Sequence, residues 1–170
     1  MRTLPTKIWQ NFQFAVAALA DEAPLRDVLE VVLFWIRNNC NYFIGEPFSI
    51  YGFDEIAKLD EGEMPVEHSS FKGADLINFK KVVLKYQAQD VDSIARFLRD
   101  AVEEMVTIEV DRQCPNCKSE GMRVFIGRHN GLLAYQCNIC GRANYSDGGR
   151  VEAGELEFAS DRKLREVGLI

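Results

Sequence analysis

The sequence predicts an α+β protein, with a mainly helical body over residues 1–106 and a four-cysteine β module over residues 107–150. Three observations predict this division. Apolar residues recur at helical spacing to about residue 105, the period then changes to strand-like alternation, and four of the five cysteines lie between Cys114 and Cys140. A tail, residues 151–170, is expected to pack on the rest.

The first two helices of the body are expected to begin near Pro5 and near Pro24. The second is apolar on almost every side, because Val31 and Phe34 add to its main apolar face, so we expect it to be the buried central helix. The inward residues of the first helix are predicted to be Ile8, Phe12, Ala15, Val16 and Leu19.

Two further helices are expected after an exposed acidic loop at residues 60–70, and Asp90 or Asp92 is a suitable N-cap for the later one. The aromatic stretch at residues 41–53 predicts a short strand or a tight loop on the core. The inward residues of the two helices are predicted to be Leu76, Phe79, Val83 and Tyr86 in one and Val91, Ile94, Leu98, Ala101, Val102 and Met105 in the other.

The C-terminal part has strand-like alternation. Residues 122–126 and 132–136 flank a His129–Asn130–Gly131 turn, which predicts a β-hairpin. Ile108 and Val110 suggest a strand before it. The tail offers one more strand around Leu156 and Phe158, followed by a short helix from Ser160.

The cysteines form two C-x2-C pairs, Cys114 with Cys117 and Cys137 with Cys140, and 19 residues separate the pairs. Two intervening residues let one tight turn direct both sulfurs to a single ion, and the predicted hairpin brings the pairs together. This spacing is typical of a tetrahedral zinc site. Four thiolates leave no open position on the ion, so we expect one structural Zn²⁺.

Residues 107–150 resemble the zinc-ribbon family, in which two C-x2-C knuckles are joined by a β-hairpin with a third strand alongside. Cys114, Cys117, Cys137 and Cys140 match the ligand positions. Gly141 follows the second knuckle, where a positive φ is often needed. Lys118 departs from the pattern, because the first knuckle often has glycine there.

Two alternatives to zinc remain, a redox pair and an iron site of the rubredoxin type. A redox C-x2-C is expected in a βαβ setting, and neither pair has one. The fifth cysteine, Cys40, has no partner in the sequence and follows the central helix, where a free cysteine is typically a small apolar residue.

The sequence contains no motif of an active site, and we expect a protein that is not an enzyme. The two histidines, His68 and His129, lie in the acidic loop and at the hairpin tip, where each can be exposed without a role. The carboxylates of residues 54–67 predict a solvated loop, or else a docking surface. Acid–base catalysis would require a pocket with shifted pKa values.

The N-terminal residues show no signal peptide, and the most apolar run, residues 28–36, is far shorter than the roughly 20 residues that span a bilayer. We therefore expect a cytoplasmic protein without membrane contact. Composition is that of an ordinary globular protein, with 47% hydrophobic and 27% charged residues.

Charge is divided unevenly. Residues 1–110 carry 11 Lys and Arg against 18 Asp and Glu, whereas residues 111–150 carry 6 against 3. An acidic body favours a protein partner with a basic surface, because complementary charge speeds and orients docking. Immunity proteins that neutralise nuclease toxins, and inhibitors of similar size, share this character.

The alternative function is nucleic-acid binding or transcription-related regulation through the cysteine module. Phe125 or Tyr135 could stack on bases. However, four thiolates with Zn²⁺ add a charge of −2, which removes most of the basic excess. The residues that could meet phosphates are Arg112, Lys118, Arg123, Arg128, Arg142 and Arg150.

Overall fold

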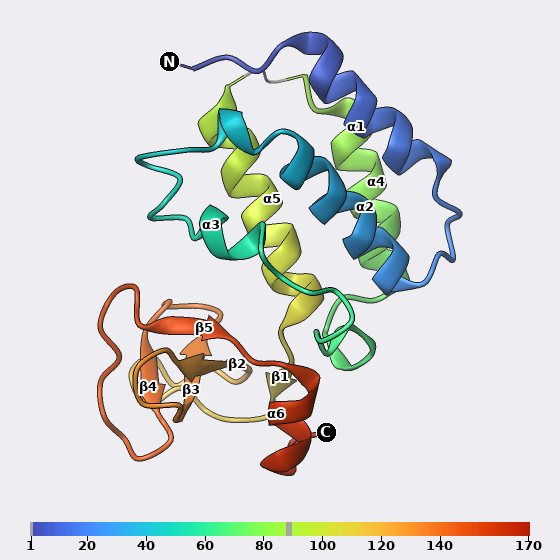
Figure 1. Ribbon diagram of the computed structural model, residues 1–170. Helices are drawn as coiled ribbons and strands as arrows, with labels where there is room; N and C mark the ends of the chain where they lie inside the picture. The colour runs from blue at the N-terminus through green and yellow to red at the C-terminus, as the bar shows by residue number, and fades with distance from the viewer. Residues whose placement is uncertain (1, 88–89) are drawn as a thin grey trace. The chain divides into compact units, whose positions relative to one another are not determined.

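The computed structural model describes residues 2–87 and 90–170, and it contains helices and one antiparallel sheet (Figure 1). The chain divides into two compact units. A helical unit contains residues 1–62 and 71–105, and a cysteine unit contains residues 63–70 and 106–170. Segment 63–70 thus belongs with the sheet, although the sequence placed it in the helical body.

The helical unit contains α1 (Thr6–Ala18), α2 (Leu25–Asn38), η1 (Cys40–Tyr42), α3 (Phe53–Ile56), α4 (Gly73–Lys85) and most of α5 (Val91–Val106). Pro5 and Pro24 precede α1 and α2 as predicted. The Asp90 carboxylate accepts a hydrogen bond from the backbone N–H of Ser93 at 3.2 Å, as an N-cap does. These local signals were therefore interpreted correctly.

The inward faces are mostly those predicted. All six predicted residues of α5 are buried, and α4 buries Leu76, Phe79 and Val83. In α1 the buried face is turned slightly, because Trp9 is inside with Phe12 and Val16 while Ala15 is exposed. Trp9 packs edge-on against Trp35, with ring centroids 5.8 Å apart, which draws this side of α1 inward.

Two predictions of exposure or burial were wrong, and one prediction was confirmed in one of its two alternatives. Helix α2 is not buried on every side, because Phe34 is 67% exposed. Of the two alternatives for residues 41–53, the tight loop on the core is confirmed, because these residues form η1 and turns, and Phe43, Phe48 and Phe53 pack in the core. Residues 60–70 are not a fully exposed loop, since Met64 and Val66 are buried within it.

The cysteine unit contains η2 (Val66–His68), the sheet β1 (Glu109–Val110), β2 (Met122–Gly127), β3 (Leu133–Cys137), β4 (Ala143–Tyr145) and β5 (Leu156–Phe158), and α6 (Asp161–Glu166). The strand order is β1-β2-β3-β4, and β5 also pairs with β2. The predicted hairpin is confirmed, as are the strand near Leu156 and the helix capped by Ser160, whose hydroxyl accepts from the Lys163 N–H.

Both faces of β2 are covered. Val124 and Ile126 pack on one face with Ile108, Ala159 and Leu164, and Phe125 packs on the other with Ala134 and Tyr145. The sequence suggested that Phe125 was available to stack on a base, but its side chain is only 4% exposed. Residues of the C-terminal tail, including Leu156 and Phe158, cover it.

Candidate metal centre

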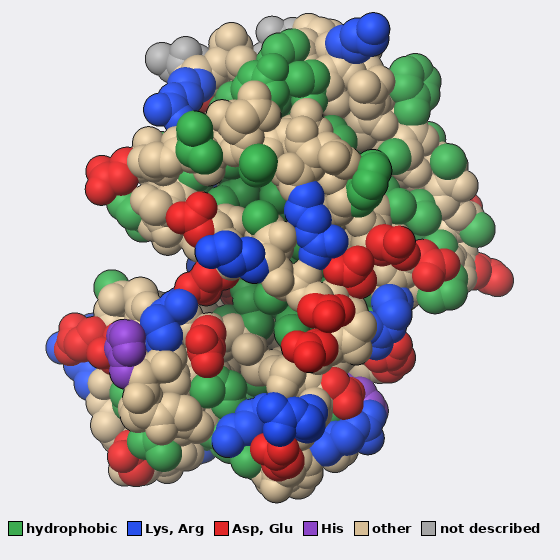
Figure 2. Space-filling view, viewed as in Figure 1, with side chains coloured by type: hydrophobic (Ala, Val, Ile, Leu, Met, Phe, Trp, Pro, Cys, Tyr) green, Lys and Arg blue, Asp and Glu red, His purple; other side chains and the backbone are tan. Residues whose placement is uncertain are grey.

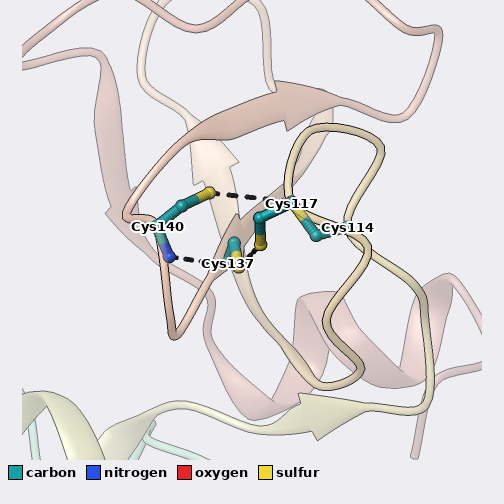
Figure 3. A group of neighbouring side chains, drawn as sticks. All are labelled: Cys114, Cys117, Cys137 and Cys140. Carbon is teal, nitrogen blue, oxygen red and sulfur yellow. Dashed lines mark hydrogen bonds between the residues drawn. The ribbon is translucent and has the colours of Figure 1, made fainter.

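The β2–β3 hairpin brings the two cysteine pairs together. Cys114 and Cys117 precede β2, and Cys137 ends β3 opposite Met122. As a result, the four cysteine sulfurs lie within 4.8 Å of one another, from segments separated by 19 residues in the chain (Figure 3). The cysteines are free thiols rather than disulfides. Four thiols at this spacing could hold one metal ion.

The two knuckles have the same backbone closure. In the first, the Lys118 N–H donates to the Cys114 carbonyl at 3.0 Å, and the Cys114 N–H donates to the Ser119 carbonyl at 2.8 Å. In the second, Gly141 donates to Cys137 at 3.0 Å, and Cys137 donates to Arg142 at 2.9 Å. These two backbone hydrogen bonds therefore fix the positions of both cysteines in each turn.

Both closures require a left-handed residue directly after the second cysteine. Gly141 has φ 70°, which fulfils the prediction for that glycine, and Lys118 has φ 64°. A lysine in this region is strained by its Cβ, which glycine lacks. The Lys118 ammonium donates to the Pro115 carbonyl at 3.0 Å, and this bond offsets part of the strain.

Hydrogen bonds to sulfur favour the thiolate form at this site. The backbone N–H groups of Cys140 and Ile139 donate to the Cys137 sulfur at 3.4 Å each. The N–H of Cys140, together with the Ser119 hydroxyl, lowers the pKa of Cys137 to about 6. A thiolate is the form that binds a metal, so this shift favours binding at Cys137. The pKa of Cys140 is raised instead, because the lowering by the Arg142 backbone N–H is outweighed by burial and by hydrogen bonds with the neighbouring thiols.

Ser119 is a site residue that the sequence reading missed. Its hydroxyl oxygen lies 3.0 Å from the Cys117 sulfur and 3.2 Å from the Cys137 sulfur, so it touches one sulfur from each knuckle. The hydrogen bond from Ser119 also lowers the pKa of Cys117. The sequence does show a hydroxyl residue two positions after a ligand cysteine. Whether its side chain points to the sulfurs depends on the backbone conformation of the turn, which the sequence alone does not give.

The other candidate residues lie apart from this cluster. Cys40 is exposed in the helical unit, and His68 and His129 are exposed on the cysteine unit. The basic residues proposed for phosphate contact have partners within the protein, such as Asn116 for Arg142 and Glu152 for Arg150. Arg128 donates to the carbonyls of Gly154 and Leu156, and the Arg112 guanidinium lies 4.2 Å from the centre of the Tyr135 ring.

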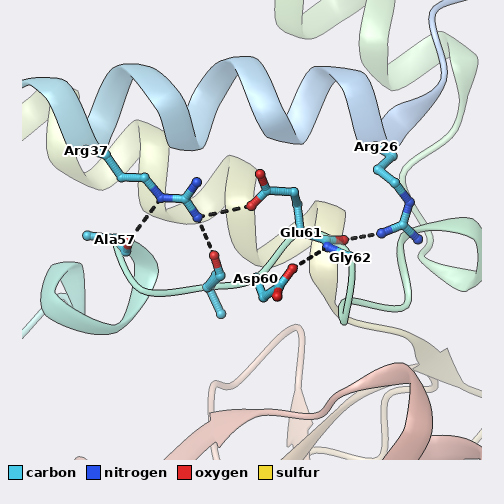
Figure 4. A network of polar contacts seen from close by, with 7 residues as sticks. Arg26, Arg37, Ala57, Asp60, Glu61 and Gly62 are labelled. Atoms are coloured by element: carbon cyan, nitrogen blue, oxygen red, sulfur yellow. Dashed lines mark hydrogen bonds and ion pairs between the residues drawn. The ribbon is translucent and has the colours of Figure 1, made fainter.

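Part of the acidic segment of residues 54–67 is held by hydrogen bonds and an ion pair to arginines of α2 (Figure 4). Arg37 on α2 donates to the Ala57 carbonyl at 3.0 Å and forms an ion pair with Glu61 at 3.0 Å. The hydrogen bond from Arg37 lowers the pKa of the Glu61 carboxyl. Arg26 donates to the backbone carbonyl of Glu61. The two arginines thus fix the segment to α2, which corrects the view of a wholly solvated loop.

No protein-family model, curated protein sequence or solved structure matches the chain. Within residues 2–87 and 90–170, none of the helices has the length and apolar character that crossing a membrane requires.

Proposed function

We propose that the protein is a non-enzymatic binding protein, in which one structural Zn²⁺ held by Cys114, Cys117, Cys137 and Cys140 stabilises the cysteine unit. The observation that carries the proposal is the convergence of four thiols from two equivalent knuckles. Four thiolates complete a tetrahedral zinc site and leave no position for substrate or water, which favours a structural ion.

The sulfur spacing fits a tetrahedral ion of the size of zinc. A Zn–S bond of about 2.3 Å places the sulfurs of a regular tetrahedron about 3.8 Å apart. The Cys114 and Cys140 sulfurs are 3.7 Å apart, and those of Cys117 and Cys137 are 3.5 Å apart. The hairpin, its two knuckles and strand β4 beside β3 fit the resemblance to a zinc ribbon.

The metal is tested by elemental analysis of the purified protein. We expect about one zinc per chain and no absorption of an iron–thiolate centre in visible light. Removing the metal with a chelator should unfold the cysteine unit, since metal binding contributes on the order of 10 kcal/mol to folding in small zinc modules. A metal-free chain with an intact β2–β3 hairpin would contradict the proposal, as would iron at one per chain.

For the partner, we favour a protein with a basic surface, such as a nuclease toxin or another enzyme that the chain would inhibit. The excess of acidic residues over residues 1–110 supports this choice. Nucleic acid is the weaker candidate, because Phe125 is buried and Arg128 is engaged with the backbone of the C-terminal tail.

Two measurements separate these candidates. Affinity capture from the native host should recover a protein with a Lys- and Arg-rich surface, and binding to duplex or single-stranded DNA and RNA should be negligible at physiological salt. Nucleic-acid binding that persists at this salt would favour nucleic acid as the partner. In that case the slope of log K against log salt should fall by about 0.7–0.9 for each phosphate contact that a substitution removes.

A further inference from the structure

Helices α1 and α2 form a groove of about 450 Å³ on the helical unit. Ile8 and Ala15 of α1 face Val31 and Phe34 of α2 across it. Trp35 closes its base, and the indole N–H donates to the Ile8 carbonyl at 3.1 Å, which links the two helices at this point. The groove is thus a concave, largely apolar surface on two helices that pack together.

Phe34 is the residue of this groove that most needs explaining. Helix α2 buries six residues, including Trp35 at the base of the groove, whereas Phe34 leaves 67% of its side chain exposed. A single exposed apolar residue is ordinary, but here it adjoins the half-buried Ile8 and Val31 in one groove. An aromatic side chain in such a setting is a typical anchor for a protein partner.

Charge indicates the kind of partner. Among the described residues that line the groove, Glu30 is the charged one. Asp27 lies one turn earlier on α2 and is also exposed. Both are acidic, as is the excess charge of residues 1–110. An anionic membrane or a nucleic acid would be repelled here, whereas lysine or arginine beside an apolar stripe would be attracted.

We propose that the α1–α2 groove is the docking site for an amphipathic helix of the protein partner, with its apolar stripe against Phe34 and Val31 and a lysine or arginine beside Glu30. Helices bind in such grooves through apolar side chains at positions i, i+3 or i+4, and i+7. This inference rests on the proposed protein-binding function and specifies the surface that carries it.

The test uses a fluorescein-labelled 18-residue helical peptide of leucine and lysine with one apolar face. A peptide of the same pattern with glutamate in place of lysine serves as its control. We expect the lysine peptide to bind the full-length protein and the glutamate peptide to bind at least tenfold more weakly. Phe34→Ser should weaken the lysine peptide at least tenfold, and Glu30→Gln should weaken it severalfold at low salt.

Phe14→Ser is the matched control variant, because Phe14 is a 73% exposed phenylalanine of α1 that does not line the groove. It should leave binding within twofold of the wild type. Equal losses from Phe14→Ser and Phe34→Ser would overturn the proposal, because they would indicate non-specific adsorption. Self-association of the protein that Phe34→Ser abolishes would also overturn it, by assigning the groove to a second copy.

The captured partner provides a separate test. If it binds Phe34→Ser as tightly as the wild type, the groove is the wrong surface while the protein-binding function stands. If no protein partner exists and nucleic acid binds instead, the proposed function itself fails.

Discussion

The first knuckle, residues 114–119, and the second, residues 137–142, share the two backbone hydrogen bonds that close each turn. Their side chains differ at the two positions after the second cysteine, which are Lys118 and Ser119 in one and Gly141 and Arg142 in the other. Ser119 contacts sulfur, whereas the Arg142 guanidinium donates to the Asn116 side-chain oxygen at 2.7 Å.

This difference separates two requirements. The backbone closure positions the sulfurs, and it tolerates lysine at a positive φ. The Cys117 sulfur has hydrogen bonds from both the side chain and the backbone of Ser119, whereas the Cys137 sulfur accepts from the backbone N–H groups of Ile139 and Cys140 within its own knuckle. The knuckles should therefore respond alike to loss of a ligand and differently to changes beside the ligands.

Loss of a ligand is expected to have the largest effect. Cys117→Ser and Cys137→Ser should each lose the metal and unfold the β2–β3 hairpin, an effect on the order of 10 kcal/mol of apparent folding free energy. Metal content and hydrogen exchange of the hairpin amides would measure this. Cys40→Ser is the control and should retain full metal. Equal metal loss from Cys40→Ser would show that the ligand set is wrong.

Acid should remove the same stabilisation gradually. The pKa of Cys137 is lower in the folded chain than the unfolded value of about 8.5. The contribution of this thiolate is therefore complete above that pH and is lost as the pH falls through the folded value. For Cys137 in the metal-free chain that value is about 6. Metal release followed against pH should therefore be acid-driven. Release that increases toward alkaline pH would contradict this sign.

Ser119→Ala should weaken metal binding about tenfold, which is the lower end for residues that hydrogen-bond to metal ligands. Its midpoint pH for metal release should also rise, because the hydroxyl lowers the pKa of Cys117 and Cys137. Competition with a zinc chelator would measure the affinity. Arg142→Ala, at the equivalent position of the second knuckle, should have a smaller effect, because the Arg142 side chain reaches a sulfur only through Asn116, which donates to Cys140 at 3.6 Å. Equal effects would mean that the Ser119 hydroxyl does not act on the sulfurs.

The smallest effects should have opposite signs. Gly141→Ala introduces a Cβ at φ 70° and should cost about 1 kcal/mol of stability. Lys118→Gly relieves the same strain at φ 64° and should stabilise the unit by about 0.5 kcal/mol, after the entropic cost of glycine. Thermal unfolding of the zinc-loaded variants would show the signs. Destabilisation by both would indicate that the Lys118 bond to Pro115 outweighs the strain.

Short-range patterns explain what the sequence predicted well. The C-x2-C pairs and the hairpin between them involve residues close in the chain, as does the Asp90 cap of α5, so local chemistry determines them. The positive φ at Gly141 was predicted from its place in the knuckle alone. The fold class and the grouping of the four cysteines therefore needed no knowledge of tertiary packing.

The errors came from contacts between distant residues. Phe125 alternates with its neighbours as an outward residue should, but the C-terminal tail covers it. Phe34 lies in an apolar run, which predicted burial, yet 67% of its side chain is exposed at the α1–α2 groove. Glu61 lies in a strongly acidic segment, but Arg37, which lies 24 residues earlier in the chain, pairs with it. For Phe125 and Glu61 the deciding partner is remote in sequence.

The division of the chain has a consequence for how the protein can be cut. The backbone passes between the two units three times, after Gly62, after Ser70 and after Met105. Each unit is built from two stretches of the chain, so a single cut at any crossing gives two fragments that both contribute to at least one of the units. Limited proteolysis should therefore nick the protein, with the fragments held together by the packing within that unit. A truncated chain that starts at residue 107 would keep every ligand cysteine but lose the Glu63 carbonyl that accepts from the Asp161 N–H. The cysteine unit therefore cannot be isolated intact by truncating the chain at residue 107. A fragment of residues 107–170 should be less stable than the same residues in the full-length protein.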